Sequence, residues 1–205
     1  MVNVELEETY RLGELHDYPM FMKICCDTLN SEWKRSETAR MHSLQKSSSA
    51  FPVSLVMFAA KSKEFFGHAR VCRILERTDA CFIESVIVMS EKRGRGLGRR
   101  LMALVEEYAR QHGFLTIYLT TKDKQSFYEH LGYTYCEPMT ASNSSCVTLE
   151  TIDRIQGLPA APATVFALSG TDGALPPPPS PPPPPPPQWV KGKRIDRNWM
   201  MKILR

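Results

Sequence analysis

One succession of strand, loop and helix constrains the fold of this chain more than any other feature. Residues 80–89 (ACFIESVIVM) are almost continuously apolar and β-branched, which is typical of a strand buried on both faces. A glycine- and arginine-rich loop follows at residues 93–100, and apolar residues then recur at helical spacing from Leu97 to Tyr108, before Gly113. Such a succession predicts a layered α/β domain.

Shorter patterns on both sides extend this prediction. Further strands are expected at residues 10–15, 52–60, 65–75, 115–120 and 133–136, and further helices at 19–29, 35–44 and 123–131. The strands at 52–60 and 65–75 are expected to form a hairpin. The order of the elements indicates a mixed α/β sheet.

Composition bounds the classes of protein to which the chain can belong. Its 205 residues, 42% of them hydrophobic, suffice for one domain with a core of its own. A net charge of +4 is too small for a protein that coats nucleic acid, so we expect no nucleic-acid partner. No apolar stretch reaches the ~20 residues of a membrane span, and the start MVNVELEE lacks the pattern of a secretory signal. We therefore expect a soluble cytoplasmic protein without a membrane partner.

The six cysteines show no C-x-x-C spacing and lie mostly within apolar stretches. This pattern favours reduced, buried thiols over disulfides or zinc ligands. We expect no metal.

A proline tract breaks the average composition. Between Pro176 and Pro187, 11 of the 16 prolines of the chain are interrupted only by Ser180. Proline has no N–H donor and a fixed φ, so this tract predicts a polyproline II rod, which can serve as a docking segment or as a stiff spacer. The expected organisation is a core at residues 10–155, a flexible loop at 156–188 that contains the tract 176–187, and a returning final strand of the same domain at 189–205.

The loop RGRGLGRR, at residues 93–100, is a candidate anion site. Glycines allow close approach of the backbone, and the free N–H groups of a first helical turn attract negative charge. The alternative is a solvated basic loop before a surface helix. A nucleotide-triphosphatase loop would need Lys and then Ser or Thr after Gly98, where Arg99 and Arg100 stand. The dinucleotide-binding pattern would need glycine at position 99 and an acidic residue about 20 residues on, so it also fits poorly.

Arg93, Gly96 and Gly98 match the pyrophosphate-loop pattern [R/Q]-x-x-G-x-[G/A] of the GCN5-related N-acetyltransferase (GNAT) superfamily, which the chain resembles over residues 10–135. Other landmarks in order are Glu84 on the strand before the loop, and the pairs Phe127-Tyr128 and Gly132-Tyr133. The resemblance implies a central, mixed, mostly antiparallel twisted sheet flanked by helices, with the polyproline loop inserted before the last strand.

The resemblance also implies acetyl-coenzyme A (acetyl-CoA) as co-substrate. The strand before the loop would pair with the pantetheine arm, and a backbone N–H there would polarise the thioester carbonyl. The residues expected to bind acetyl-CoA are Val86, Ile87, Val88, Arg93, Gly94, Arg95, Gly96, Leu97, Gly98, Arg99, Ser126 and Tyr128.

Two residues are expected to move protons. The family places a phenol beside the sulfur, so Tyr128 is the candidate acid for the leaving thiolate; its alternative role is that of a core aromatic. Glu84 is the candidate base, through a water molecule, because a lone carboxylate in an apolar strand is costly unless it is paired or used. The alternative is a structural ion pair with Arg70 or Arg73. His68 is a weaker candidate base.

The acceptor can be argued from proton affinity. At pH 7, roughly 10% of an α-amine with a pKa near 8 is neutral, against ~0.04% of a lysine side chain, so an α-amine needs less help from the enzyme. The chain also resembles, more closely, the N-terminal acetyltransferases of processed actin (NatH type). This likeness rests on NSEWKRS at residues 30–36, RMHSL at 40–44, GHAR at 67–70 and a polyproline segment before a Trp-containing final strand.

That closer resemblance implies actin, with its acidic N-terminus, as the substrate, and profilin, recruited by the polyproline tract, as the partner. The expected wall of the acceptor groove consists of Trp33, Arg35, Arg40 and Arg70. For any single arginine the alternative is a solvated surface position. Two other functions remain open: a GNAT enzyme that acts on lysine or small amines, and a proline-bearing adaptor with a vestigial site.

Overall fold

The computed structural model describes residues 9–74, 77–138 and 198–204. In chain order its elements are β1 (Tyr10–Glu14), the 3-10 turns η1 (Leu15–Asp17) and η2 (Pro19–Phe21), α1 (Met22–Glu32), α2 (Glu37–Gln45), β2 (Val53–Ala59), β3 (Phe65–Ile74), β4 (Arg77–Val88), the 3-10 turn η3 (Ser90–Lys92), α3 (Leu97–Gln111), β5 (Thr116–Thr121), α4 (Gln125–His130), β6 (Thr134–Tyr135) and β7 (Asn198–Ile203). Every strand and helix predicted between residues 10 and 136 is present.

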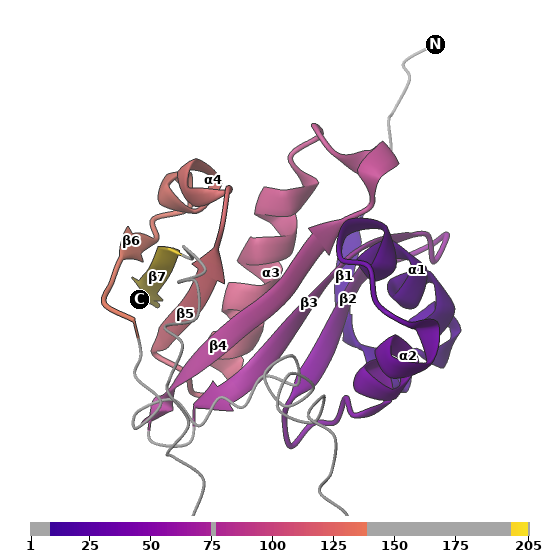
Figure 1. Cartoon of the computed structure of the whole chain (residues 1–205), viewed down its shortest axis with the longest axis horizontal. Helices are drawn as coiled ribbons and strands as arrows, with labels where there is room; N and C mark the ends of the chain where they lie inside the picture. The colour runs from indigo at the N-terminus through magenta and orange to yellow at the C-terminus, as the bar shows by residue number, and fades with distance from the viewer. Residues whose placement is uncertain (1–8, 75–76, 139–197, 205) are drawn as a thin grey trace, which may run out of the picture.

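The strands form one seven-stranded sheet in the order β1-β2-β3-β4-β5-β7-β6 (Figure 1). Among the described strands, β4 and β5 pair in parallel and every other neighbouring pair is antiparallel. The prediction of a mixed, mostly antiparallel sheet is therefore confirmed. The predicted limits of the core at residue 155 and of the loop at 156–188, with the proline tract, lie outside the described residues and stay predictions.

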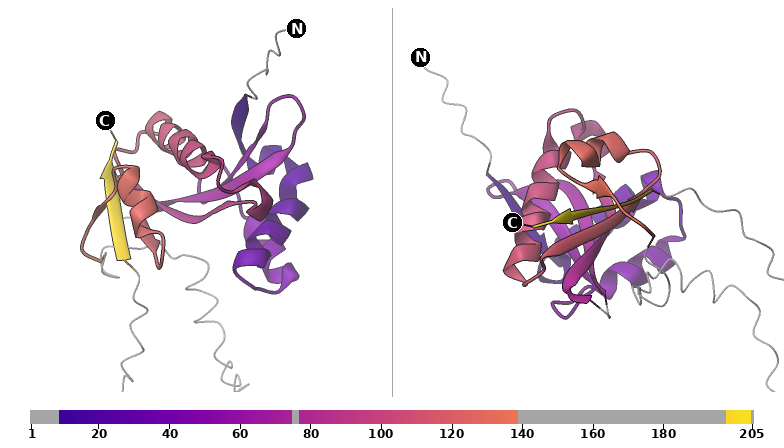
Figure 2. Two further views of the ribbon diagram at one scale, coloured as in Figure 1. Left: turned by 90° about the horizontal axis from the view of Figure 1, so that it is seen from above. Right: turned by 90° about the vertical axis from the view of Figure 1, so that its left-hand side faces the viewer.

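Helices cover both faces of the sheet, as Figure 2 shows: α3 lies on one face, and α1 and α2 lie on the other. The buried stripe of α3 packs on the sheet through residues such as Leu101, Met102 and Val105. On the opposite face, α1 and α2 form a second apolar cluster with the sheet that includes Leu29 and Leu44. The active-site candidates are thus mounted on elements held by two separate parts of the core.

Local signals account for the first helices. Pro19 occupies the first position of η2, where a missing N–H costs nothing, and the chain then continues into α1. Ser36 caps α2 as expected, because its Oγ accepts the N–H of Ala39 at 3.2 Å.

The described cysteines agree with the expectation of free thiols. Cys25, Cys26, Cys72 and Cys81 are free and buried, and Cys136 is free and partly exposed. Cys146 lies outside the described residues. No helix within the described ranges combines the length and apolar character needed to cross a bilayer.

Candidate active site

The glycine loop leads from the end of β4 into α3. Gly94 and Gly96 have φ values of 79° and 76°, a region that L side chains rarely adopt, and a Cβ at either position would meet no atom within 4 Å. Backbone conformation therefore selects glycine here, and the space above the loop is open. Gly96 is the N-cap of α3 and supplies no side-chain cap, so the first-turn N–H groups are available to an anion.

Gly98 has a different role, because it lies in the first turn of α3. A Cβ at this position would come within 3.3 Å of the Phe127 ring on α4. The glycine thus allows the start of α3 to lie against the helix that carries Tyr128. Leu97 beside it is buried, whereas Arg95 and Arg99 are exposed on the loop and the first turn.

Arg93, the first residue of the pyrophosphate-loop pattern, directs its side chain toward the protein. Its Nε donates to the carbonyl oxygen of Val88 at 3.0 Å, and its Nη2 pairs with the Glu32 carboxylate at 2.8 Å. The guanidinium therefore fastens the loop to the end of β4 and to the end of α1. Direct contact of this side chain with a phosphate stays a prediction.

The strand before the loop leaves part of its edge unpaired by β5. β4 pairs with β5 from Ala80 to Ile83, and Figure 1 shows the two strands diverging beyond that point. Ile87 and Val88 remain paired to His68 and Gly67 of β3 on their other side. The edge that faces away from β3 can therefore accept an extended ligand as an added strand would, which fits the pantetheine arm expected there.

A β-bulge lies between these two parts of β4. His68 pairs with Ile87 and Arg70 pairs with Glu84, so one residue of β3 lies opposite two residues of β4. The extra residue is Ser85, whose φ of 55° is in the left-handed region. The bulge reverses the alternation of faces: Ile83 and Val86 both pack into the core cluster that contains α3.

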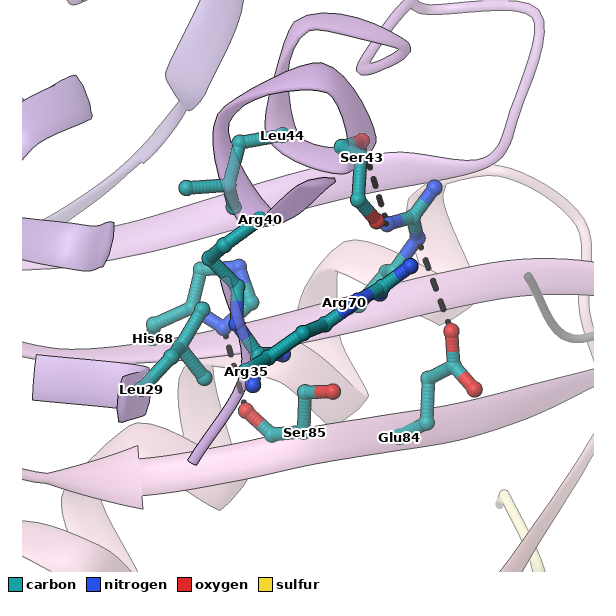
Figure 3. Close-up of a pocket in the computed structure, with 9 residues that line it drawn as sticks. All are labelled: Leu29, Arg35, Arg40, Ser43, Leu44, His68, Arg70, Glu84 and Ser85. Carbon is teal, nitrogen blue, oxygen red and sulfur yellow. Dashed lines mark hydrogen bonds and ion pairs between the residues drawn. The ribbon is translucent and has the colours of Figure 1, made fainter. Parts of the chain in front are cut away.

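The opposite face of this strand lines a narrow pocket beneath α1 and α2 (Figure 3). The pocket gathers side chains from α1, the segment before α2, α2 itself, β3 and β4. Its lining residues are Leu29, Arg35, Arg40, Ser43, Leu44, His68, Arg70, Glu84 and Ser85. Three expected acceptor residues and both candidate bases therefore meet at one place.

Glu84 and Arg70 form an ion pair inside this pocket. Arg70 Nε lies 3.5 Å from Glu84 Oε1, and the two side chains are 5% and 15% exposed. Arg70 also donates to Ser43, at 2.9 Å to Oγ and 3.3 Å to the backbone oxygen. The ion-pair alternative for Glu84 is thus present with Arg70, whereas Arg73 stacks on the Phe51 ring, 4.9 Å from its centroid.

Arg40 joins α2 to the end of α1. It is only 4% exposed; its Nε donates to Asn30 Oδ1 at 3.1 Å and its Nη2 to the carbonyl oxygen of Trp33 at 2.6 Å. A solvated surface position is therefore wrong for Arg40, and for the equally buried Arg70. Trp33 itself is 42% exposed, and Arg35 is partly exposed at the pocket.

His68 is buried beside these arginines. Its Nδ1 lies 3.0 Å from the carbonyl oxygen of Ser85, and because a carbonyl only accepts, Nδ1 carries the proton. Burial lowers the pKa of His68 to about 4, and the charges of Arg70 and Arg40 act in the same direction. His68 is 1% exposed and its Nδ1 proton is engaged by Ser85, whereas the Glu84 side chain is 15% exposed, so Glu84 is the more accessible candidate base.

Tyr128 lies on α4 with its ring in the core. The ring is 8% exposed and packs edge-to-face against Phe127 and Tyr133, with centroids 5.1 and 5.6 Å away. Burial raises the pKa of the phenol to about 12, so at neutral pH it holds the proton that an acid must donate. Ser126, on the preceding part of α4, is exposed.

One group of possible metal ligands occurs in the described part of the chain. The ligand atoms of Glu14, His16 and Asp17 lie within 4.8 Å of one another, and none of these residues lines the pocket. The Glu14 carboxylate already accepts from Tyr108 and Ser49, at 2.7 and 2.9 Å. The absence of a metal stays a prediction.

Sequence reasoning missed the residues that shape the pocket rather than line it with charge. Ser43 and Asn30 hold the two buried arginines. Ser85 forms the bulge, and its only signal is a second polar residue beside Glu84 in an apolar strand. The roles of these three residues depend on partners that are not their sequence neighbours, so spacing alone could not reveal them.

Comparison with known proteins concerns the family and the fold of the chain. Residues 18–133 match the model of the acetyltransferase (GNAT) family. The chain is 42% identical over 126 residues to the curated protein N-alpha-acetyltransferase 80 of Mus musculus; the match covers 59% of this chain and 40% of that protein. The chain therefore matches well under half the length of this relative.

Solved structures show the same fold. An aminoglycoside 6'-N-acetyltransferase in complex with coenzyme A gives a TM-score of 0.59 at 14% identity, covering 95% of this chain and 97% of that one. An N-acetylglutamate synthase of Neisseria gonorrhoeae, in complex with coenzyme A and N-acetyl-glutamate, gives 0.56 at 13% identity, covering 97% of this chain and 36% of that one. At such identities the likeness concerns the fold alone.

Proposed function

The chain belongs to the acetyltransferase (GNAT) family, and from that premise we propose that it acetylates the α-amine of proteins with an acidic N-terminus, with processed actin as the acceptor. The observation that carries the proposal is the charge of the pocket in Figure 3. Arg35, Arg40 and Arg70 line it with a single carboxylate, that of Glu84, while His68 is neutral at physiological pH. This excess of positive charge suits an acidic acceptor.

The donor side suits acetyl-CoA. The open, left-handed glycines and the start of α3 fit a pyrophosphate, and the free edge of β4 at residues 86–88 fits the amide groups of pantetheine. Arg95 and Arg99 add positive charge beside the phosphates. Acetyl-CoA supplies an acetyl group activated as a thioester, and a backbone N–H of the β4 edge would polarise its carbonyl.

The proton movements follow from two side chains. A neutral α-amine attacks the thioester carbon and then loses a proton, which Glu84 accepts through a water molecule. The carbon–sulfur bond breaks, and the thiolate takes the proton of the Tyr128 phenol. In this scheme Arg70 holds the Glu84 carboxylate in the pocket at 3.5 Å, and Ser43 holds Arg70.

The likeness to the mouse protein supports an α-amine acceptor, because that protein is an N-alpha-acetyltransferase. The main alternative is a GNAT enzyme for lysine or small amines. The excess of positive charge around the pocket favours an acidic N-terminus over a small uncharged amine. An adaptor with a vestigial site is disfavoured, because the glycine loop, Glu84 and Tyr128 are all in place.

An acetyl-CoA assay over matched peptides tests this proposal. The set consists of peptides with acidic, neutral and basic N-termini, and an acidic peptide whose α-amine is blocked while one lysine stays free. We expect transfer only to free acidic N-termini. Transfer to the lysine of the blocked peptide, or equal rates on all free N-termini, would contradict it.

We propose in addition that the proline tract recruits profilin, which would deliver its bound actin to the pocket. The tract lies outside the described residues, so the proposal rests on its sequence. Eleven prolines within twelve residues favour an extended rod, and docking such a rod in an aromatic groove costs little further entropy. Tethering would raise the local acceptor concentration toward the millimolar range.

Deletion of residues 176–187 tests this role. The variant should acetylate short acidic peptides at the rate of the intact chain, because in this proposal the tract binds profilin and not the acceptor peptide. Acetylation of profilin-bound actin should slow selectively. Equal rates on that complex with and without the tract would reduce the tract to a spacer.

A further inference from the structure

We propose that His68 is a positioning residue for acetyl transfer: its hydrogen bond to the carbonyl of Ser85 holds the β4 bulge that separates the donor edge from the acceptor pocket. The inference rests on the proposed function, because it concerns the same site. Three observations support it: the register of β3 against β4, the left-handed conformation of Ser85 and the burial of His68.

The bulge decides which side each reacting group faces. In a regular strand Glu84 and Val86 would lie on the same face, because side chains alternate with a period of two. With Ser85 inserted, Glu84 lines the pocket whereas Val86 packs toward the core cluster that contains α3. The residue after them, Ile87, packs with the α1 and α2 cluster. Straightening the strand would therefore move either the carboxylate or the donor edge out of place.

Ser85 does not favour this conformation by itself. Its φ of 55° lies in the region that residues with a Cβ adopt rarely. Such a conformation persists only where surrounding contacts over-determine it. A contact of this kind is the hydrogen bond from His68 Nδ1, at 3.0 Å to the Ser85 carbonyl oxygen, shown as a dashed line in Figure 3.

His68 is well placed for such a role. It lies on β3 next to Ala69, the residue opposite the bulge, and it is only 1% exposed. Among the described residues, its Nε2 has no hydrogen-bond partner. A buried ring nitrogen without a partner is unfavourable, so packing alone would favour an apolar side chain at this position. The hydrogen bond that Nδ1 donates to Ser85 therefore explains why an imidazole stands at this position.

Two substitutions separate the two ring nitrogens. His68→Asn places an amide N–H near the position of Nδ1 and can still donate to Ser85, whereas His68→Gln places its amide near Nε2. We expect His68→Gln to lower kcat by about 10- to 100-fold, the effect of a small misplacement of reacting groups, with little change in the KM of an acidic peptide. His68→Asn should retain kcat to within about threefold.

A third substitution tests whether His68 acts through Ser85. Glycine adopts positive φ without strain, so in Ser85→Gly the bulge should depend less on the hydrogen bond from His68. In the His68→Gln background, Ser85→Gly should recover most of the lost kcat. A merely structural role for His68 predicts equal losses in both His68 variants and no recovery by Ser85→Gly, and that result would overturn the proposal.

Amide hydrogen exchange over residues 84–88 supplies a readout that needs no activity. Exchange should accelerate in His68→Gln and return toward the wild-type rate in His68→Asn. Unchanged exchange in His68→Gln would show that His68 does not hold the bulge. Faster exchange with an unchanged kcat would show that the bulge held by His68 does not matter for acetyl transfer. If the intact chain transfers acetyl to no peptide, the proposed function is wrong. Coenzyme A binding, measured by calorimetry, and hydrogen exchange then still decide whether His68 shapes the donor edge.

Discussion

The proposed donor side and the proposed acceptor side of this molecule are built in opposite ways. The donor side consists of backbone: left-handed glycines, the first turn of α3 and an unpaired edge of β4, all within residues 84–100. The acceptor side consists of side chains from segments that lie far apart in the chain, from Leu29 to Ser85. It contains two arginines that are 4% exposed and are held by other side chains and carbonyls.

This difference has a physical consequence. A backbone site tolerates changes in neighbouring side chains but is sensitive to any residue that fills or charges the loop. A site of buried charges is held together by partners, so the removal of one group leaves another without compensation. Substitutions on the donor side should therefore affect binding selectively, whereas those on the acceptor side should also affect stability.

The largest expected effect concerns the loop. Gly96→Glu puts a carboxylate where the pyrophosphate is expected; a like charge near 4 Å costs about 4 kcal/mol at an effective dielectric constant of 20, or roughly 10³-fold in affinity. Calorimetry with coenzyme A measures it. Gly113→Glu is the matched control, because Gly113 also has a positive φ, of 80°, and open space, but lies at the far end of α3. Equal losses in both variants would refute the loop assignment.

The next largest effect concerns the stability of the folded chain at acid pH, and it arises from His68 on the acceptor side. The pKa of His68 is about 4 in the folded chain and near 6.5 when unfolded, so between these values the unfolded chain binds more protons. Stability should therefore decrease as the pH falls from about 6.5 to 4, by up to about 3 kcal/mol. Protonation would add a buried positive charge beside Arg40 and Arg70.

Urea unfolding across this pH range, compared between the intact chain and His68→Asn, isolates the contribution of the imidazole from that of the carboxylates. The variant should lose less stability on acidification. Parallel curves for the two proteins would show that His68 is not the group that titrates.

Tyr128→Phe should lower kcat by about 10²-fold, as expected for the loss of a general acid, with little change in acetyl-CoA affinity. Tyr133→Phe is a suitable control, since it removes a phenol from the same buried cluster. Steady-state kinetics with an acidic peptide give both values. An unchanged kcat in Tyr128→Phe would leave Tyr128 with its packing role only.

The smallest effect is expected at Arg35, which is partly exposed at the pocket. Arg35→Glu should raise the KM of an acidic peptide by about tenfold, because exposed ion pairs contribute roughly 1 kcal/mol or less and a charge reversal adds repulsion. The same KM should rise with salt concentration in the intact chain. Added salt shortens the Debye length, which is ~8 Å at 0.15 M, and so weakens the attraction between Arg35 and an acidic peptide. Arg110→Glu, at the far end of α3, should change neither the KM of the acidic peptide nor its dependence on salt. A KM independent of salt would argue against charge recognition.

Much of the fold was predictable because its signals are local. The apolar strand before the loop, the stripe from Leu97 to Tyr108 and the Ser36 cap each depend on neighbours within a few residues, and each is present. The same holds for Gly94 and Gly96, whose positive φ follows from the turn into a helix.

The acceptor pocket was predictable only in part. The sequence indicated Arg40 and Arg70 as charges near a substrate, but a solvated surface was the common expectation for either. Their burial depends on Asn30 and Ser43, which the packing of α1 and α2 on the sheet brings within reach. No spacing rule connects these residues.

The order of the elements, the glycine loop and the residue types that the proposed acetyl transfer needs can be read from the amino-acid sequence, because these are properties of short segments. The pairing of Glu84 with Arg70, the turn of Arg93 toward Val88 and Glu32, and the reversal of the faces of β4 at Ser85 are visible only in the folded chain. These outcomes depend on which buried polar groups meet, and a buried group is paired by whatever the fold brings near it.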